Sequence, residues 1–383
     1  MPVRATKRGA ERTPLDGRHD VLICGASFAG LAVARELAGS GADVLVVDRY
    51  EIGERQTSAC AAPTEWLENL GLGDSIRQTF SDLVVHAGGR DRISVTWPMP
   101  YEFSTFDYRE LCALLAAQGE FAFETAKVEG IRRGDPDHVV VTDRGELTAP
   151  LVVDALGWRR VLGAGTIQPP DALLSRGLEV HPGGTSPDLA LYLDRRYVPA
   201  GYGWSFPARD EVRVGVGSFD PRYHVKDPTL ALTADLGVAP EGFQGNWIPH
   251  ALRPATEDGV FFAGDSAGHC LPATAEGIRT ALYFGVACGR ELRAVVEGRR
   301  TRAEALARYA AFSDSHASAF RKLKRAQDLV GWIVPKERLL RAVVRLLTAR
   351  RILGWFFPKY MAVAPPEFVL SESPALAVAR GRA

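Results

Sequence analysis

The residues that carry the clearest chemistry in this chain are small side chains along a turn near the N-terminus. Gly25, Ser27 and Gly30 follow a short apolar run, and an amphipathic run and a second apolar run then end at Asp48. Glycine at the first and last of these positions permits a tight turn and close packing of a helix on a strand. Backbone N–H groups at a helix N-terminus attract a pyrophosphate, and a carboxylate such as Asp48 accepts hydrogen bonds from ribose hydroxyls. The spacing therefore predicts a site for an ADP moiety.

The elements that must position these residues are a strand, a helix and a second strand, which form the first βαβ unit of a Rossmann-like fold. Ser27 stands where the second glycine of this pattern is usual, and its hydroxyl could itself donate a hydrogen bond to a phosphate. The alternative is an ordinary turn between a strand and a helix, with no ligand.

A second motif lies far along the chain. An apolar strand from Gly259 ends in Gly264-Asp265, a loop with Pro272 follows, and a helix is expected to begin near Gly277-Ile278. With this run the chain resembles the FAD-dependent geranylgeranyl reductase family, within the wider fold group of aromatic hydroxylases and flavin halogenases. The similarity extends to about Leu292.

The resemblance implies that FAD is bound. It implies that Asp265 binds the ribityl or pyrophosphate part of FAD and that Arg109 reaches toward the phosphates. It also implies that the backbone N–H groups of Gly277 and Ile278 face the pyrimidine ring of the flavin. Without it, Asp265 could be a helix cap and Arg109 a solvated arginine. The full set of cofactor residues expected is Gly25, Ser27, Phe28, Ala29, Gly30, Asp48, Arg49, Arg109, Gly157, Gly264, Asp265, Pro272, Gly277 and Ile278.

An aromatic run is the expected substrate site. Residues 199–207 match the Pro-x-x-Tyr-x-Trp-x-Phe-Pro motif of geranylgeranyl reductases without a mismatch. Because side chains alternate along a strand, Tyr202, Trp204 and Phe206 should share one face. The resemblance implies that this face lines an apolar cavity for an isoprenoid chain, whereas an aromatic stripe by itself is also typical of an ordinary core.

Cys60 is the candidate catalytic residue, because it matches a cysteine that the family places near the flavin ring. A thiol there could donate a proton while hydride leaves the flavin, or it could be a small buried apolar group. His269 and Cys270, in the flavin loop, are second candidates.

The predicted fold class is α/β, with a Rossmann-like FAD-binding domain, an inserted antiparallel β domain for substrate and a helical C-terminal region. We expect a flexible leader at 1–19, the FAD-binding domain at 20–82, 105–165 and 250–300, the substrate lobe at 83–104 and 166–249, and the helical region at 301–383. Within the substrate lobe, residues 83–95 should form a strand that turns back at the proline-rich segment Trp97–Tyr101.

Composition narrows the class of partner. Lys+Arg and Asp+Glu are both 46, so no global charge recruits a nucleic acid. Five cysteines without a CxxC pair indicate neither a zinc site nor a disulfide framework and fit a reducing cytoplasm. No apolar run reaches the length of a membrane span, but the basic amphipathic segment 336–351 and the aromatic Trp355–Pro358 could contact a membrane surface. A helix packed over the substrate lobe is the alternative.

The sequence thus predicts an FAD-dependent oxidoreductase that reduces C=C bonds of an apolar, isoprenoid substrate. No second glycine-rich βαβ unit is present for a nicotinamide, so NAD(P)H or a reduced electron-transfer protein is expected as a transient donor. A monooxygenase or halogenase of the same fold and a non-catalytic flavin or lipid carrier are the alternatives. The oligomeric state is left open.

Overall fold

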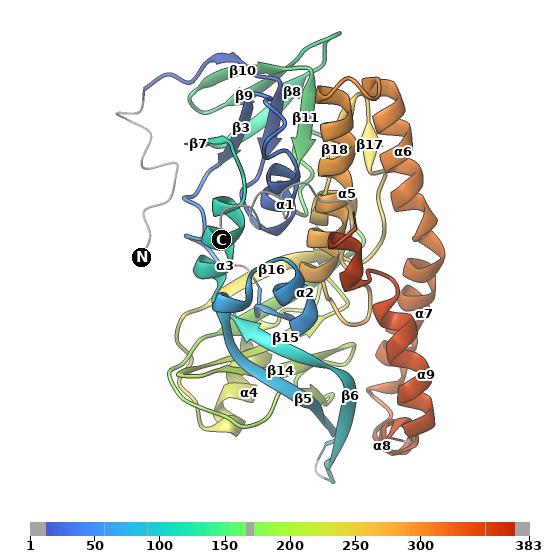
Figure 1. The fold of residues 1–383 in the computed structure, drawn as a ribbon. Helices are drawn as coiled ribbons and strands as arrows, with labels where there is room; N and C mark the ends of the chain where they lie inside the picture. The colour runs from blue at the N-terminus through green and yellow to red at the C-terminus, as the bar shows by residue number, and fades with distance from the viewer. Residues whose placement is uncertain (1–12, 57, 90, 166–171, 349, 372–383) are drawn as a thin grey trace.

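The computed structural model describes residues 13–371, except residues 57, 90, 166–171 and 349. Its strands form three sheets, and long helices run along one side of the molecule (Figure 1). No helix within these ranges is both long and apolar enough to cross a membrane.

A six-stranded sheet forms the Rossmann-like part, which confirms the predicted fold class. Its strands are parallel except at the edge, where the first pair is antiparallel. In sheet order they are β17 (Thr256–Glu257), β18 (Val260–Phe262), β11 (Leu151–Asp154), β2 (Val21–Cys24), β3 (Val44–Asp48) and β7 (Ala122–Thr125). Strands β18, β11 and β2 are neighbours, so three segments far apart in the sequence end side by side at the carboxyl edge.

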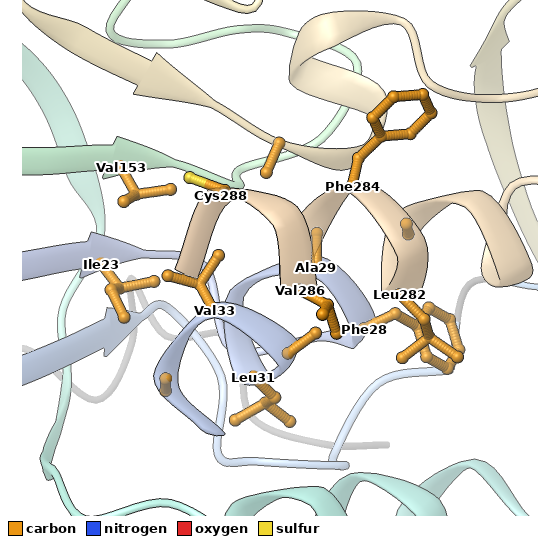
Figure 2. Close-up of a cluster of buried hydrophobic side chains, with 14 of the residues drawn as sticks. Ile23, Phe28, Ala29, Leu31, Val33, Val153, Leu282, Phe284, Val286 and Cys288 are labelled. Carbon is orange, nitrogen blue, oxygen red and sulfur yellow. The ribbon is translucent and has the colours of Figure 1, made fainter. Parts of the chain in front are cut away.

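Two helices lie together against this sheet, α1 (Phe28–Glu36) and α5 (Ile278–Val296). Glycines on α5 let the two backbones approach. A Cβ at Gly285 would lie 2.7 Å from the Ala29 carbonyl oxygen, and one at Gly289 would lie 2.6 Å from Cβ of Glu36. Apolar side chains of α1, α5 and the sheet interlock in the large core between them (Figure 2).

A four-stranded sheet adjoins this part and includes the start of the described chain. Its order is β1 (Gly17–Arg18), β10 (Gly145–Ala149), β9 (His138–Thr142) and β8 (Val128–Arg132). The expected flexible leader is corrected here for its last residues, because β1 pairs in parallel with β10 and Leu15 is buried. The first twelve residues of that leader lie outside the described residues.

An eight-stranded sheet carries the predicted aromatic strand. Its order is β16 (Gln244–Pro249), β12 (Leu174–Val180), β15 (Glu211–Ser218), β14 (Gly201–Ala208), β13 (Ala190–Leu193), β5 (Ile76–Ala87), β6 (Ile93–Phe106) and β4 (Ala61–Pro63). The expected turn at Trp97–Tyr101 was wrong, since this segment lies inside β6. The sheet also takes in β4 and the start of β5, which the predicted division gave to the FAD-binding domain. That division stays a prediction.

Short and C-terminal helices complete the fold. Those beside the sheets are α2 (Thr64–Asn69), η3 (Gly73–Ser75), α3 (Tyr108–Ala117), α4 (Lys226–Leu236) and η4 (Gly264–Ala267). The C-terminal ones are α6 (Arg302–Ser315), α7 (Ala317–Ile333), α8 (Glu337–Leu347), α9 (Arg350–Met361) and η5 (Pro366–Val369). The apolar face of α8 packs on β5, where Leu340 and Val344 meet Val85 and Ala87. Much of the amphipathic face of α8 is therefore buried within the protein.

Candidate functional site

The glycine turn after β2 leaves no room for larger residues. Gly25 has φ +112°, and a Cβ there would lie 2.3 Å from the Ala155 carbonyl oxygen. A Cβ at Gly30 would lie 1.8 Å from the carbonyl oxygen of Gly25. Ser27 directly precedes α1, and its Oγ accepts a hydrogen bond from the Tyr108 hydroxyl at 3.1 Å. The Ser27 hydroxyl therefore keeps its own proton free for another acceptor.

Asp48 at the end of β3 is held against this turn. Its carboxylate accepts hydrogen bonds from the N–H groups of Ala26 (2.8 Å) and Tyr50 (3.0 Å). Burial raises the pKa of Asp48, and these hydrogen bonds oppose the rise. Arg49 is exposed, with its guanidinium carbon 4.8 Å from the centroid of the Tyr50 ring.

Arg109 lies near the same edge, on the first turn of α3. Its Cα would be 2.9 Å from a Cβ at Gly53, which has φ +72°. The Arg109 side chain is exposed. The structure thus brings Arg109 next to the loop after Asp48 and leaves its guanidinium open to solvent.

Asp154, at the end of β11, is a site residue that sequence reasoning missed. Its fully buried carboxylate accepts hydrogen bonds from the N–H groups of Leu156 (2.9 Å) and Leu162 (2.8 Å) and from Ser266 Oγ (2.6 Å). It thereby joins the loop that carries Gly157, where φ is +84°, to η4. The available signal was an acidic residue at the end of an otherwise apolar buried strand.

Asp265 lies in η4, close to the first glycine turn. A Cβ at Gly264 would be 2.9 Å from Cβ of Ala29, which shows how tightly the two motifs meet. Burial raises the pKa of Asp265 to about 6, and the charge of Arg253 partly opposes this. Within the described part of the chain, no group donates a hydrogen bond to its carboxylate. Asp265, which is partly exposed to solvent, is thus an acceptor without a hydrogen-bond partner among these residues.

The loop from η4 to α5 ends in a helix start without a side-chain cap. Pro272 lies in this loop, and Ala273 and Ala275 both have positive φ, at 70° and 53°. Ala275 therefore adopts a conformation that favours glycine. Gly277 precedes α5 with no side chain bonded to the helix end. The first N–H groups of α5, from Ile278, lack partners within the helix and can bind an acceptor.

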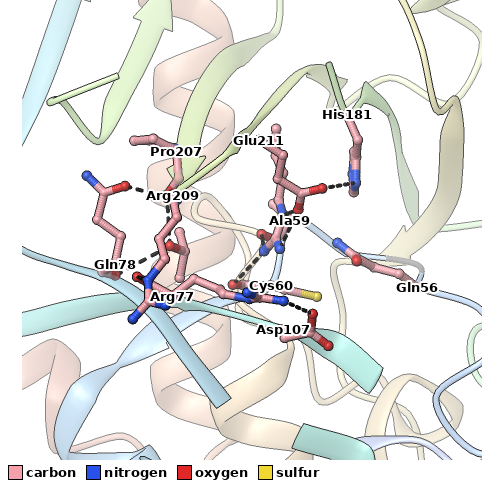
Figure 3. Close-up of polar contacts among 12 residues, drawn as sticks. Gln56, Ala59, Cys60, Arg77, Gln78, Asp107, His181, Pro207, Arg209 and Glu211 are labelled. Carbon is pink, nitrogen blue, oxygen red and sulfur yellow. Dashed lines mark hydrogen bonds and ion pairs between the residues drawn. The ribbon is translucent and has the colours of Figure 1, made fainter. Parts of the chain in front are cut away.

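Cys60 is a residue of the large core and directly precedes β4 of the eight-stranded sheet. Its thiol donates to the Ser58 carbonyl oxygen at 3.2 Å, and burial raises the pKa of Cys60 well above its usual range. Arg213, which is 2% exposed, donates to the carbonyl oxygens of Ala59 (2.8 Å) and Cys60 (3.1 Å). Figure 3 shows Ala59 and Cys60 near Glu211 and Asp107. The Cys60 segment is thereby fixed to β15 with its thiol protonated.

His269 is packed away from the loop. Its ring stacks on Phe284 with centroids 3.7 Å apart, and Nε2 lies 3.0 Å from Ser313 Oγ. Burial lowers the pKa of His269 well below its usual range, so the ring is neutral. Burial likewise raises the pKa of the Cys270 thiol. Both second candidates thus lie in fully buried positions, and His269 serves the packing between α5 and α6.

The aromatic strand β14 presents Tyr202, Trp204 and Phe206 on one half-buried face, as strand alternation requires. The opposite face packs on α4, where a Cβ at Gly203 would lie 2.8 Å from Leu232. The Tyr202 hydroxyl donates to the Thr274 carbonyl oxygen at 2.5 Å. The aromatic face is therefore turned toward the loop that precedes α5.

A cleft of about 380 Å³ adjoins the same loop. Gln327 in its wall accepts a hydrogen bond from the Ala273 N–H at 3.0 Å, and Phe219 lies with its ring centroid 6.0 Å from that of Tyr202. Apolar and charged side chains share its lining, including Leu173, His250, Lys324 and Asp328.

The described residues fit a dinucleotide with a flavin ring. Five features meet at one edge of the six-stranded sheet. They are the glycine turn, Asp48, the Gly157 loop, the unpartnered Asp265 carboxylate and the uncapped start of α5. Acceptors and free N–H groups at this edge complement ribose hydroxyls, phosphates and a ring carbonyl.

Comparisons with known proteins agree with this geometry. A family profile described as lycopene cyclase protein matches residues 20–200. The chain is 24% identical over 342 residues to digeranylgeranylglycerophospholipid reductase 2 of Methanosphaera stadtmanae, which covers 81% of this chain and 86% of that protein. It is 27% identical over 314 residues to the menaquinone reductase of Mycolicibacterium smegmatis, covering 71% and 75% of the two chains.

Among solved structures, a geranylgeranyl bacteriochlorophyll reductase-like protein from Thermoplasma acidophilum superposes with a TM-score of 0.78 at 16% identity. The match covers 94% of this chain and 100% of that one. A probable FAD-dependent monooxygenase from Pseudomonas aeruginosa and a flavin-dependent brominase share the fold, with TM-scores of 0.66 and 0.64. The chain is thus similar in sequence to digeranylgeranylglycerophospholipid reductases, and it shares the fold of a geranylgeranyl reductase-like protein and of flavin-dependent monooxygenases and brominases.

Proposed function

We propose that this protein reduces C=C bonds of an isoprenoid chain, with FAD held at the carboxyl edge of the six-stranded sheet. The observation that carries the proposal is the contact between the aromatic strand and the loop before α5, through Tyr202 and the Thr274 carbonyl oxygen. The contact supports the proposal because it joins this half-buried face to the loop whose residues we assign to the flavin ring. The names of the relatives, a digeranylgeranylglycerophospholipid reductase and a menaquinone reductase, support an isoprenoid substrate.

The cofactor residues keep the roles that the sequence assigned. Asp48 binds the adenosine ribose, and the backbone N–H groups of the turn at Gly25 and Ser27 bind the pyrophosphate. Asp265 binds the ribityl or pyrophosphate part. The N–H groups of Gly277 and Ile278 face the pyrimidine ring, where a helix N-terminus favours negative charge. When bound and reduced, FAD supplies a hydride. NAD(P)H or a reduced electron-transfer protein reduces it in a transient encounter.

Tyr202, Trp204 and Phe206 line the substrate chamber and exclude water from it. Cys60 is the proposed proton donor, since burial keeps its thiol protonated and the Arg213 contacts fix its backbone. A neutral thiol can release a proton to carbon as hydride arrives, and it is then reprotonated from solvent.

A monooxygenase or halogenase is the second candidate function, because those enzymes share this fold. A non-catalytic flavin or lipid carrier is the third. The three differ in what they do with a reduced flavin, a lipid and oxygen.

The deciding experiment is an anaerobic single turnover. Flavin-loaded protein is reduced with dithionite, mixed with a geranylgeranyl lipid or menaquinone, and the product is weighed by mass spectrometry. We expect a gain of two hydrogen atoms for each double bond reduced, together with reoxidation of the flavin. Product that forms only in air and carries oxygen or halogen supports the second candidate. Absence of both product and substrate-dependent reoxidation supports a carrier.

A further inference from the structure

A row of side chains crosses the large sheet beside the aromatic strand. Trp204 on β14 pairs with Gly215 on β15, Gly215 pairs with Glu179 on β12, and Glu179 pairs with Gln244 on β16. Residues directly opposite each other on paired strands point to the same face of a sheet. Trp204, Glu179 and Gln244 therefore share the face that we assign to the substrate, with a glycine between the indole and the carboxylate.

Glycines create a shallow trough in this face, and the indole of Trp204 fills it. A Cβ at Gly215 would lie 2.3 Å from Cζ2 of Trp204, and one at Gly217 would lie 3.4 Å from Cζ3. At Gly177, the next glycine of the trough, the nearest Trp204 atom would be 3.7 Å away, which is an ordinary contact. The ring thus lies directly on the backbone at Gly215 and is at ordinary contact distance from positions 217 and 177.

The carboxylate of Glu179 fixes the ring in that place. The Trp204 Nε1–H donates to Oε2 of Glu179 at 3.0 Å, and Glu179 is 4% exposed. Oε1 accepts a hydrogen bond from the Gln244 side-chain amide and lies 3.0 Å from His181 Nε2. Both oxygens are therefore held, and the charge-assisted bond to the indole is strong.

The same network reaches the Cys60 segment. Gln244 Nε2 lies 3.3 Å from the Ser58 carbonyl oxygen, which also accepts the Cys60 thiol at 3.2 Å. Movement of the indole or of Glu179 would thus also shift the segment that carries Cys60.

We infer that Glu179 is a positioning residue that holds the Trp204 indole down on Gly215, and so sets the depth of the chamber and the length of chain that it accepts. The inference rests on the proposed function. With the indole flat, the chamber keeps its full depth. If the acceptor is lost, or a methyl group is placed beneath the ring, the indole rises into the chamber and long chains lose room.

The test is binding of a chain-length series to the flavin-loaded protein. Dissociation constants for geraniol, farnesol and geranylgeraniol are measured by isothermal titration calorimetry. For Gly215→Ala and Glu179→Leu we expect geranylgeraniol to bind at least tenfold more weakly, with a smaller loss for geraniol. Glu179→Gln retains an acceptor oxygen for the indole, so its affinities should stay within about threefold of the original.

Gly177→Ala is the matched control, since the added methyl group meets only ordinary contacts in the same trough. Its chain-length profile should not change. The double variant Gly215→Ala/Trp204→Phe, with a smaller ring above the methyl group, should regain geranylgeraniol binding. If Gly215→Ala does not fold, judged by flavin absorbance and thermal unfolding, the pair Glu179→Leu and Glu179→Gln decides alone.

The outcomes separate the two proposals. If the original protein binds the alcohols and Glu179→Leu shows the same profile, the inference is overturned and the proposed function stands. If the original protein binds none of the three alcohols, the isoprenoid substrate is overturned, and the inference with it.

Discussion

At the scale of single residues, Asp265 stands out because its side chain is only partly exposed and its carboxylate has no hydrogen-bond donor among the described residues. A buried charge without a partner lowers the stability of a folded protein. Asp154, whose carboxylate accepts a hydrogen bond from the neighbouring Ser266, is fully buried and has three donors. The contrast indicates that Asp154 serves the fold and that Asp265 is held ready for a ligand.

The first prediction concerns Asp265→Asn in flavin-free protein. Because folding raises the pKa of Asp265 from about 3.8 to about 6, the folded state binds the proton more tightly than the unfolded state. The free energy of unfolding is therefore reduced as pH rises through this window, and the penalty is complete above pH 6. The variant lacks this penalty, so urea unfolding should show it more stable than the original by about 1–3 kcal/mol at pH 7.5 and equal to it below about pH 3.

The same substitution should weaken FAD binding by roughly tenfold or more, because a charged acceptor is lost. Asp154→Asn provides the contrast, since loss of its hydrogen bonds should destabilise the protein at pH 7.5. A variant Asp265→Asn that binds FAD unchanged would contradict the role given to this carboxylate.

A second prediction tests Cys60. Cys60→Ala should slow reduction of the substrate double bond by roughly 10²-fold or more in a single turnover, because the proposed acid is removed. Flavin reduction by dithionite should be unaffected. Cys288→Ala, in an equally buried thiol on α5, is the control for the cavity that is created and should keep its turnover rate. Equal rates in both variants would remove Cys60 from the mechanism.

At the scale of elements, the C-terminal helices hold the loop that precedes α5. Arg279, fully buried, donates to both carboxylate oxygens of Glu276 (2.7 and 2.9 Å) and to the carbonyl oxygens of Met361 and Ala364. Tyr360 on α9 donates to Glu276, and its hydroxyl lies 2.8 Å from Thr274 Oγ1. The position of the proposed flavin loop thus depends on the helices that follow it.

The third prediction follows from this clamp. Arg279→Met leaves the Glu276 carboxylate without its cationic partner, which should cost about 3–5 kcal/mol in urea unfolding. The double variant Glu276→Gln/Arg279→Met removes both charges and should recover part of that loss. If the double variant is no more stable than the single one, the ion pair is not the source of the effect.

The elements that could be predicted from the sequence are those with a local pattern. The first βαβ unit and the strand with Tyr202 have fixed spacing, and the structure has strands and a helix there. The turn predicted at Trp97–Tyr101 failed because its prolines lie on a part of β6 that pairs with β5 only, and an unpaired strand edge tolerates proline. Local composition does not reveal which edge is free.

The missed contacts at the site join residues that are far apart in the chain. Glu179 meets Trp204 only because β12, β15 and β14 pair in one register, and Arg213 meets Cys60 only through packing of the sheet on the Cys60 segment. Spacing along the sequence carries no record of such register. The role of Asp154 could have been predicted from the sequence, since an acidic residue at the end of a buried strand needs hydrogen-bond donors.

At the scale of the whole molecule, the end of the helical region exposes large apolar side chains. Trp332 is 58% exposed and Trp355 is 62% exposed, and the ammonium groups of Lys336 and Lys359 lie 3.0 and 3.7 Å from the centroids of their rings. Aromatic rings beside lysines suit the boundary between lipid headgroups and acyl chains. Peripheral contact with a membrane that holds the lipid substrate remains our proposal for this end.

The fourth prediction is therefore a loss of vesicle binding. Trp332→Ala/Trp355→Ala should reduce co-sedimentation with phosphatidylglycerol vesicles at least fivefold, and added salt should weaken binding of the original protein. Phe243→Ala, which removes an exposed ring from the substrate lobe, is the control. Equal sedimentation of all three proteins would show that the exposed tryptophans of α7 and α9 do not contact the membrane.

The close packing of α5 on α1 also bears on how the protein is made. The first βαβ unit has left the ribosome long before Gly285 and Gly289, the glycines that seat α5 on α1, have been translated. Until then the apolar side of α1 is exposed to solvent, and chaperones that bind hydrophobic segments can recognise it. Flavin capture should therefore be a late event in biosynthesis, after translation has passed Val296.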